Sequence, residues 1–114
     1  MTDKVRVGVI GVGYLGRFHA LIYSRMADVD LVGVVDSDPQ RAAEVAAEAG
    51  CRVVADGAAL AETVDAVSVV VPTTAHLEVA APLLRRGIHM LMEKPIAATV
   101  EEGAELVRLA EAAG

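Results

Sequence analysis

Short apolar runs alternate with amphipathic stretches along the whole chain. The apolar runs are rich in valine and cover Lys4–Ile10, Leu31–Val35, Arg52–Ala55, Ala66–Val71 and Ile88–Met92. Helical patterns follow them at Leu15–Met26, Pro39–Ala49, Ala58–Glu62, Ala75–Arg86 and Val100–Ala113. Because the strands are continuously apolar, we expect them to be buried on both faces, as in a parallel sheet. The pattern predicts an α/β fold, a doubly wound parallel sheet of about five strands with helices on both faces.

The length of the chain predicts a single domain over residues 1–114. Its 114 residues are 54% hydrophobic, with three aromatic side chains and no tryptophan. A chain of this size can bury a core of its own, and it is too short for a self-sufficient two-domain enzyme.

The net charge, the longest uncharged stretch and the single cysteine each exclude a class of partner or site. Sixteen acidic against ten basic residues give a net charge of −6, and no basic cluster exceeds Arg85-Arg86, so nucleic acid is not expected as a partner. The longest stretch without a charged residue, Ala66–Leu77, is too short to span a membrane. Cys51 is the single cysteine, which excludes an intrachain disulfide and a paired-cysteine metal site. We therefore expect a cytoplasmic protein with no metal and no membrane contact.

A glycine-rich segment follows the first predicted strand directly and opens the first helix. In Gly11-Val-Gly13-Tyr-Leu-Gly16, the first glycine permits a tight turn, the second lets the backbone approach a pyrophosphate, and the third lets helix and strand pack closely. The N–H groups of the helix end would face the phosphates. The alternative is that these glycines serve only the turn and the packing.

Asp36 ends the second strand twenty residues after Gly16, which is the spacing at which a carboxylate meets the adenosine ribose of a dinucleotide. A carboxylate accepts hydrogen bonds from the 2′-hydroxyl and repels a 2′-phosphate, so NAD is expected and NADP is disfavoured. Ser37 can assist. Arg41, one helical turn further, could stack on adenine, pair with a 2′-phosphate, or be a solvated helix charge.

Two further segments lie at the carboxyl ends of strands, where ligands collect in open parallel sheets. Val71-Pro72-Thr73-Thr74-Ala75-His76 ends the fourth strand, and Met92-Glu93-Lys94-Pro95 ends the fifth. His76 could line the cleft or simply begin a helix. Glu93 and Lys94 could form a site in which the lysine donates to a substrate oxygen, or a surface ion pair.

These motifs together resemble the N-terminal half of the Gfo/Idh/MocA oxidoreductases, which include glucose-fructose oxidoreductase and inositol dehydrogenase. The similarity spans Val5 to Gly114, and its most specific part is Glu93-Lys94-Pro95 after the fifth strand. The family has a second α/β domain that holds most substrate contacts, and no counterpart of that domain lies in these residues.

The resemblance implies a role for each matching residue. The pyrophosphate would be lined by Gly11, Gly13, Tyr14, Leu15 and Gly16, and the adenosine ribose would be held by Asp36 and Ser37. The middle and nicotinamide side of the cofactor would be flanked by Pro72, Thr73 and His76. Glu93 would reach the nicotinamide ribose, and Lys94 would be the catalytic residue that contacts the substrate hydroxyl.

The implied function is the cofactor domain of an NAD-dependent oxidoreductase acting on a hydroxyl of a sugar, polyol or sugar nucleotide. The segment Val71–His76 is similar to that of UDP-N-acetylglucosamine 3-dehydrogenases within the family. Alone, the chain is expected to bind NAD(H) without turnover. The alternatives are a nucleotide-sensing regulatory module, which needs no Lys94, and a methyltransferase, which needs more strands. The apolar excess also predicts an exposed face through which the chain forms a homo-oligomer.

Overall fold

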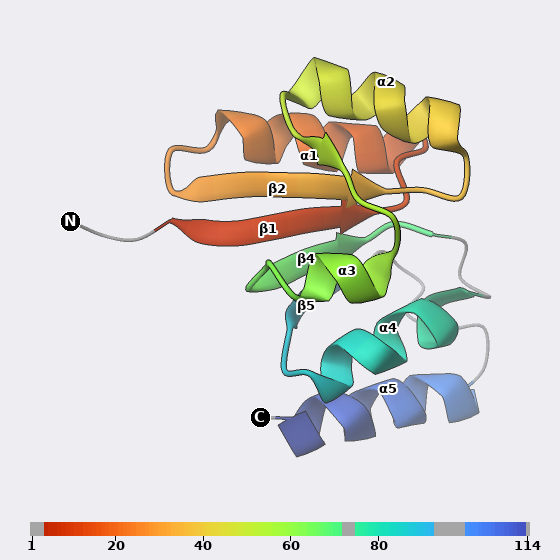
Figure 1. Ribbon diagram of the computed structural model, residues 1–114. Helices are drawn as coiled ribbons and strands as arrows, with labels where there is room; N and C mark the ends of the chain where they lie inside the picture. Colours follow the sequence, from red (N-terminus) through yellow and green to blue (C-terminus); the bar gives the residue numbers. More distant parts are fainter. Residues whose placement is uncertain (1–3, 72–74, 93–99, 114) are drawn as a thin grey trace.

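The computed structural model describes residues 4–71, 75–92 and 100–113 (Figure 1). Strands and helices alternate along these residues, in the order β1 (Val5–Ile10), α1 (Tyr14–Arg25), β2 (Val29–Val35), α2 (Pro39–Ala49), β3 (Arg52–Val53), α3 (Gly57–Ala61), β4 (Ala66–Val69), α4 (His76–Arg85), β5 (His89–Met92) and α5 (Val100–Ala113). The described helices include none that is long and apolar enough to cross a membrane.

The described strands form a five-stranded sheet in the order β3-β2-β1-β4-β5, with every neighbouring pair parallel. The chain moves outward from β1 to β3, returns across the sheet to β4, and then moves outward to β5. The strand order therefore reverses between β1 and β4, and in open α/β sheets ligands bind outside the carboxyl ends of the strands at such a reversal. The expected doubly wound parallel sheet is confirmed.

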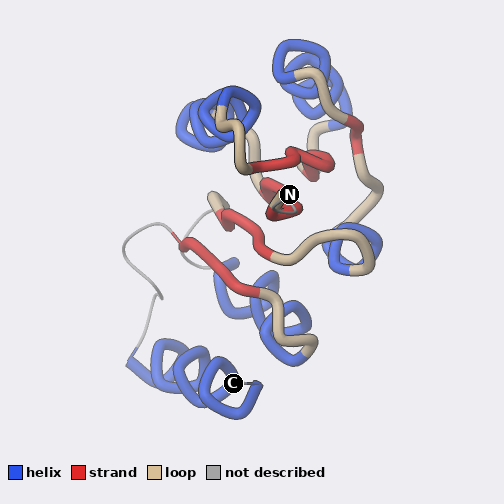
Figure 2. The backbone as a smooth tube through the Cα atoms, turned by 90° about the vertical axis from the view of Figure 1, so that its left-hand side faces the viewer, coloured by secondary structure: helices blue, strands red, loops and turns tan. Residues whose placement is uncertain are grey.

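Helices cover both faces of the sheet (Figure 2). On one face, α1 and α2 enclose a core that includes Val9, Val34 and Val45. On the other, α3 and α4 enclose a core that includes Ile10, Leu60 and Val67. The outermost helix, α5, packs against α4 through Leu106 and Leu109.

The ends of the helices follow local chemistry. The side chain of Asp38 accepts hydrogen bonds from the N–H groups of Gln40 and Arg41 and caps α2, which begins with Pro39. Gly50 ends the same helix in the left-handed conformation, with φ +74°. The sequence-based boundaries of α2 and α5 are confirmed, and those of α1, α3 and α4 differ by one residue at each end.

The edge strands depart from the expectation that all strands are buried on both faces. Burial holds for the carboxyl-terminal parts of the inner strands, whereas the first two residues of β1 are exposed. Both residues of β3 are exposed, and Leu91 of β5 is 55% exposed. The strand expected at Arg52–Ala55 contains only Arg52 and Val53, because β3 pairs with β2 at two positions before the chain turns into Asp56, the N-cap of α3. Continuous apolarity alone does not distinguish an edge strand from a central one.

Candidate functional site

A cavity of about 840 Å³ lies at the carboxyl ends of the strands, next to the reversal of the strand order. The ends of β1 and β2 contribute Gly11, Gly13, Asp36 and Ser37 to its wall. The opposite wall comes from α3, α4 and the residues that follow β4. Four of the predicted cofactor-binding residues are therefore brought together around one hollow of the size that small-molecule sites have.

The surroundings of the three glycines in the loop differ, and so does the need for a glycine at each position. Gly11 has φ +90°, and a Cβ on it would lie 2.2 Å from the carbonyl oxygen of Val70. A Cβ on Gly16 would lie 1.8 Å from the carbonyl oxygen of Gly11, so this glycine allows α1 to approach the turn. A Cβ on Gly13 would meet nothing within 4 Å. Neither the backbone angle nor packing within the described residues requires a glycine at position 13, which leaves its backbone open to a ligand.

The first turn of α1 offers its N–H groups beside this cavity. The N-cap is Gly13, and within the described part of the chain no side-chain hydrogen bond caps the helix. Helix N-termini carry unpaired N–H donors and partial positive charge, which together favour phosphate oxygens. The glycine cradle and the donor set therefore fit a dinucleotide pyrophosphate.

Asp36 is fixed by two hydrogen bonds from the backbone. Its Oδ2 accepts from the N–H of Val12 in the glycine loop, and its Oδ1 accepts from the N–H of Asp38, both at 2.8 Å. The side chain is half-buried at the cavity wall. A carboxylate oxygen has more than one acceptor position, so both oxygens retain capacity for ribose hydroxyl donors.

Arg41 reaches back from α2 to the glycine loop. Its Nε donates to the carbonyl oxygen of Val12 at 2.9 Å, and its side chain is half-buried. The interpretation of Arg41 as a solvated helix charge is therefore wrong, because the guanidinium is hydrogen-bonded to the loop. Arg41 does not line the cavity directly.

The remaining predicted residues divide into two groups. Tyr14, Leu15 and Gly16 form the first residues of α1, where Gly16 is buried and the Leu15 side chain is half exposed, outside the cavity wall. His76 is the first residue of α4. The predictions for Pro72, Thr73, Glu93 and Lys94 concern positions outside the described residues.

The wall formed by α3 and α4 was not among the sequence-based candidates. Its members include Asp56, Gly57, Ala58, Glu78, Val79 and Pro82. Asp56 could have been found, because it follows β3 at the carboxyl edge and caps α3 by accepting from the N–H of Ala59 at 2.8 Å. The Glu78 position gives no such signal, since its place on the wall depends on how α4 packs. Among the described residues there is no group of three or more His, Cys, Asp or Glu side chains suited to a metal ion.

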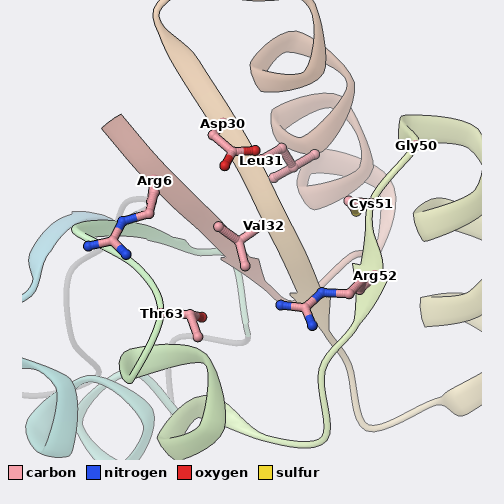
Figure 3. A pocket seen from close by; sticks show the side chains of 8 residues that line it. All are labelled: Arg6, Asp30, Leu31, Val32, Gly50, Cys51, Arg52 and Thr63. Carbon is pink, nitrogen blue, oxygen red and sulfur yellow. The ribbon is translucent and has the colours of Figure 1, made fainter. Parts of the chain in front are cut away.

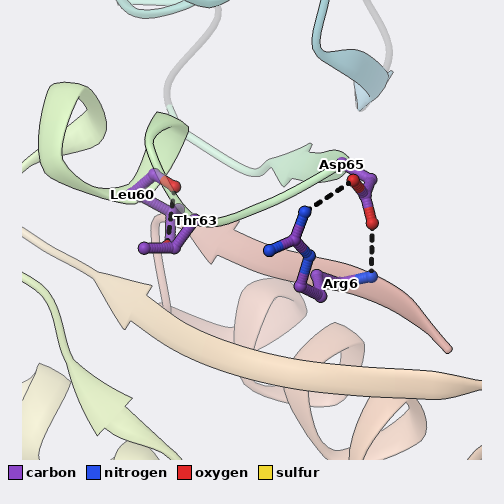
Figure 4. Close-up of polar contacts among 4 residues, drawn as sticks. All are labelled: Arg6, Leu60, Thr63 and Asp65. Atoms are coloured by element: carbon purple, nitrogen blue, oxygen red, sulfur yellow. Dashed lines mark hydrogen bonds and ion pairs between the residues drawn. The ribbon is translucent and has the colours of Figure 1, made fainter. Parts of the chain in front are cut away.

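A second, smaller hollow of about 410 Å³ is lined by the amino-terminal ends of strands, including Arg6, Asp30 and Arg52, together with Thr63 and Cys51 (Figure 3). Arg6 is already paired there, since its guanidinium and its N–H both donate to the Asp65 carboxylate (Figure 4). Burial raises the pKa of the Cys51 thiol, which keeps it protonated and a poor nucleophile. This hollow lies away from the carboxyl ends of the strands, where the candidate residues gather.

A family model described as an oxidoreductase family with an NAD-binding Rossmann fold, GFO_IDH_MocA, matches residues 5–114. The chain belongs to this oxidoreductase family. The resemblance inferred from the motifs is thereby confirmed, together with the Rossmann fold.

Several proteins similar to this chain are named as dehydrogenases. The chain is 48% identical over 107 residues to UDP-N-acetylglucosamine 3-dehydrogenase from Acidithiobacillus ferrooxidans. The aligned residues cover 94% of this chain and 34% of the relative. A solved structure of that enzyme matches 98% of this chain and 35% of its own with a TM-score of 0.92 at 46% identity. Inositol 2-dehydrogenase from Rhizobium meliloti is 38% identical over 81% of this chain and 28% of its own length.

A structure of GenD2 from gentamicin A biosynthesis, in complex with NAD, matches 100% of this chain and 33% of its own with a TM-score of 0.93 at 30% identity. That structure is a complex with NAD, and a third of its chain has the fold of this chain. The chain spans about a third of the length of each of these relatives.

Proposed function

We propose that this chain binds NAD(H) in the cavity at the carboxyl ends of the strands, as the cofactor domain of a dehydrogenase. The observation that carries the proposal is the position of Asp36, whose carboxylate is hydrogen-bonded to the glycine loop at 2.8 Å while both line the same cavity. This arrangement joins an acceptor for ribose hydroxyls to a glycine cradle for phosphates.

Each residue has a binding task in this proposal. The backbone around Gly11, Gly13 and the first turn of α1, from Tyr14 through Leu15 to Gly16, would hold the pyrophosphate. Asp36 and Ser37 would hold the adenosine ribose and, through the negative charge of Asp36, disfavour a 2′-phosphate, so that NAD is preferred to NADP. When bound, the nicotinamide would supply the hydride acceptor.

The substrate class of the proposal comes from the relatives. A hydroxyl of a sugar, polyol or sugar nucleotide is favoured because the similar proteins are a UDP-N-acetylglucosamine 3-dehydrogenase and an inositol 2-dehydrogenase. The proposed catalytic residue is Lys94, which would donate to the substrate oxygen, and Glu93, Pro72, Thr73 and His76 would flank the nicotinamide side. Since the chain spans about a third of these relatives, we propose that it binds cofactor without turnover by itself.

The test is a titration of the purified chain with NADH and, separately, NADPH, followed by cofactor fluorescence. We expect saturable binding of NADH and weaker binding of NADPH. Circular dichroism of the same sample shows whether the chain is folded. A folded chain that binds neither cofactor would contradict the proposal.

A further inference from the structure

The glycine loop is held by the end of β2, by Asp36 directly after it, and by Arg41 of α2. Gly11 N–H donates to the carbonyl oxygen of Val35, and Val12 N–H donates to Asp36. The carbonyl oxygen of Val12 in turn accepts from Nε of Arg41 at 2.9 Å. Both polar backbone groups of Val12 are therefore bound by side chains that lie 24 and 29 residues further along the chain.

The contact to Arg41 sets the direction of the next N–H group. The carbonyl of Val12 and the N–H of Gly13 belong to one peptide plane, and in a trans peptide they point in opposite directions. A bond that holds the carbonyl toward Arg41 therefore turns the Gly13 N–H away from Arg41. Gly13 lines the cavity, whereas Arg41 and the fully buried Val12 do not.

The Gly13 carbonyl accepts from the N–H of Arg17 at 2.9 Å and Val12 is fully buried, but the Arg41 contact is the hydrogen bond made to the carbonyl of the Val12–Gly13 peptide itself. The φ of −67° and ψ of −154° of Gly13 are extended values, and a Cβ on it would meet open space. A glycine can adopt several backbone conformations at small cost, so the dihedral angles of Gly13 add little restraint to the peptide. The carbonyl-to-guanidinium hydrogen bond is charge-assisted, which makes it about twice as strong as a neutral one.

We infer that Arg41 is a positioning residue, which holds the peptide between Val12 and Gly13 so that the Gly13 N–H faces the cavity as a donor for the cofactor pyrophosphate. This role differs from a direct contact with adenine or with a 2′-phosphate. It rests on the proposed function for the identity of the ligand, but the orientation of the peptide belongs to the free chain.

The first test therefore needs no ligand. In a ¹⁵N–¹H correlation spectrum of the free chain, Arg41→Gln is expected to displace the amide signal of Gly13 and to leave distant amides in place. The matched control is Arg52→Gln, which removes an exposed arginine from β3, far from the loop. An unmoved Gly13 signal in a folded Arg41→Gln chain would overturn the inference, even if the chain binds no dinucleotide at all.

The second test uses the cofactors. If the peptide holds the cavity-facing orientation only about a tenth of the time without Arg41, the dissociation constants of NADH and NADPH should both rise about tenfold. A loss confined to NADPH would overturn the inference in favour of a 2′-phosphate contact. If the wild-type chain binds neither cofactor, the proposed function fails, while the amide comparison still decides the role of Arg41 in the loop.

Arg41→Lys separates positioning from charge, because it keeps the positive charge and replaces Nε with a methylene group. If Arg41 acts by positioning, the Gly13 amide signal and the NADH affinity must change together. A lysine that restores the wild-type Gly13 signal should also restore wild-type NADH affinity. Wild-type affinity in Arg41→Lys combined with a displaced Gly13 signal would show that charge alone matters and would overturn the inference. The lysine variant also provides a second folded protein if Arg41→Gln is unstable.

Discussion

At the scale of single residues, Asp36 serves two partners with one carboxylate. It accepts from Val12 N–H and Asp38 N–H, and it also lines the cavity in which we place the adenosine ribose. Its orientation is therefore set by the backbone before any ligand arrives. Pre-orientation of this kind reduces the cost of ordering the site on binding.

Removing the charge of Asp36 should weaken the discrimination against NADPH. Like charges brought together at a binding site cost several kcal/mol, so in Asp36→Ala the ratio of NADPH to NADH affinity should rise about tenfold or more. Asp36→Asn is the matched variant, because its amide oxygen can still accept from Val12 N–H. The dissociation constants of both cofactors measure the effect by fluorescence titration. An unchanged ratio in both variants would show that Asp36 does not face the ribose.

A second prediction concerns Asp65, where the backbone N–H and then the guanidinium of Arg6 hold the pKa of the carboxyl below its ordinary value of 3.8. A carboxylate whose pKa is lowered by folding stabilises the native state above its unfolded pKa, and this contribution disappears as pH falls through the folded pKa. Asp65→Asn should therefore be less stable than wild type at neutral pH, and the difference should shrink below about pH 4.

Urea unfolding at several pH values measures this difference. Glu101→Gln on α5, which removes another exposed carboxylate, is the control. A stability difference between wild type and Asp65→Asn that stays constant down to about pH 2 would contradict the assigned interaction.

At the scale of elements, two glycines at the junction of β1 and α1 should affect different properties: Gly16 the stability of the fold, and Gly13 the binding of the cofactor. In Gly16→Ala the new methyl group would lie 1.8 Å from the Gly11 carbonyl oxygen, so α1 must move, and overpacking of this kind costs about 1–3 kcal/mol. In Gly13→Ala the methyl group meets open space at a φ of −67°, so stability should fall only by the small cost of alanine at an N-cap and less than in Gly16→Ala.

Gly13→Ala should weaken the binding of NADH more than it affects stability. The methyl group would stand where we place the approaching pyrophosphate, so NADH affinity should fall strongly although the thermal unfolding temperature changes less than in Gly16→Ala. Calorimetry and NADH titration of the two variants measure the two properties. Wild-type NADH affinity in Gly13→Ala would place the pyrophosphate elsewhere in the cavity.

The elements show which parts of the fold and site can be predicted from sequence. The alternation of strands and helices, the Asp38 cap and the loop-to-Asp36 spacing depend on neighbours in the chain or on a recurring unit, and they were predictable. The bond from Arg41 to Val12 depends on the loop conformation, and the place of Glu78 on the cavity wall depends on how α4 packs. Neither relation leaves a periodic or local signal in the sequence.

At the scale of the whole molecule, part of the high hydrophobic fraction lies exposed on the surface of α1. Leu15, Phe18 and Ile22 are 50%, 40% and 57% exposed, and Met26 directly after the helix is 45% exposed. Their spacing of three and four residues places them along one side of the helix. The Arg17 side chain, by contrast, is bonded to Glu48 of α2, so the side toward α2 is occupied. The stripe is the kind of exposed apolar surface that marks an interaction site.

We predict that two copies of this chain associate through the α1 stripe, because a two-fold axis across a helix brings the same residues of both copies together. Multi-angle light scattering should then give a mass above the 11.8 kDa of one chain, rising with concentration. Ile22→Glu should restore the monomer mass, since a charge would be buried at the centre of the contact. Val107→Glu on α5, at 54% exposure, is the matched control and should leave association intact. A mass of one chain at every concentration would contradict the prediction, and equal effects of both variants would move the contact away from α1.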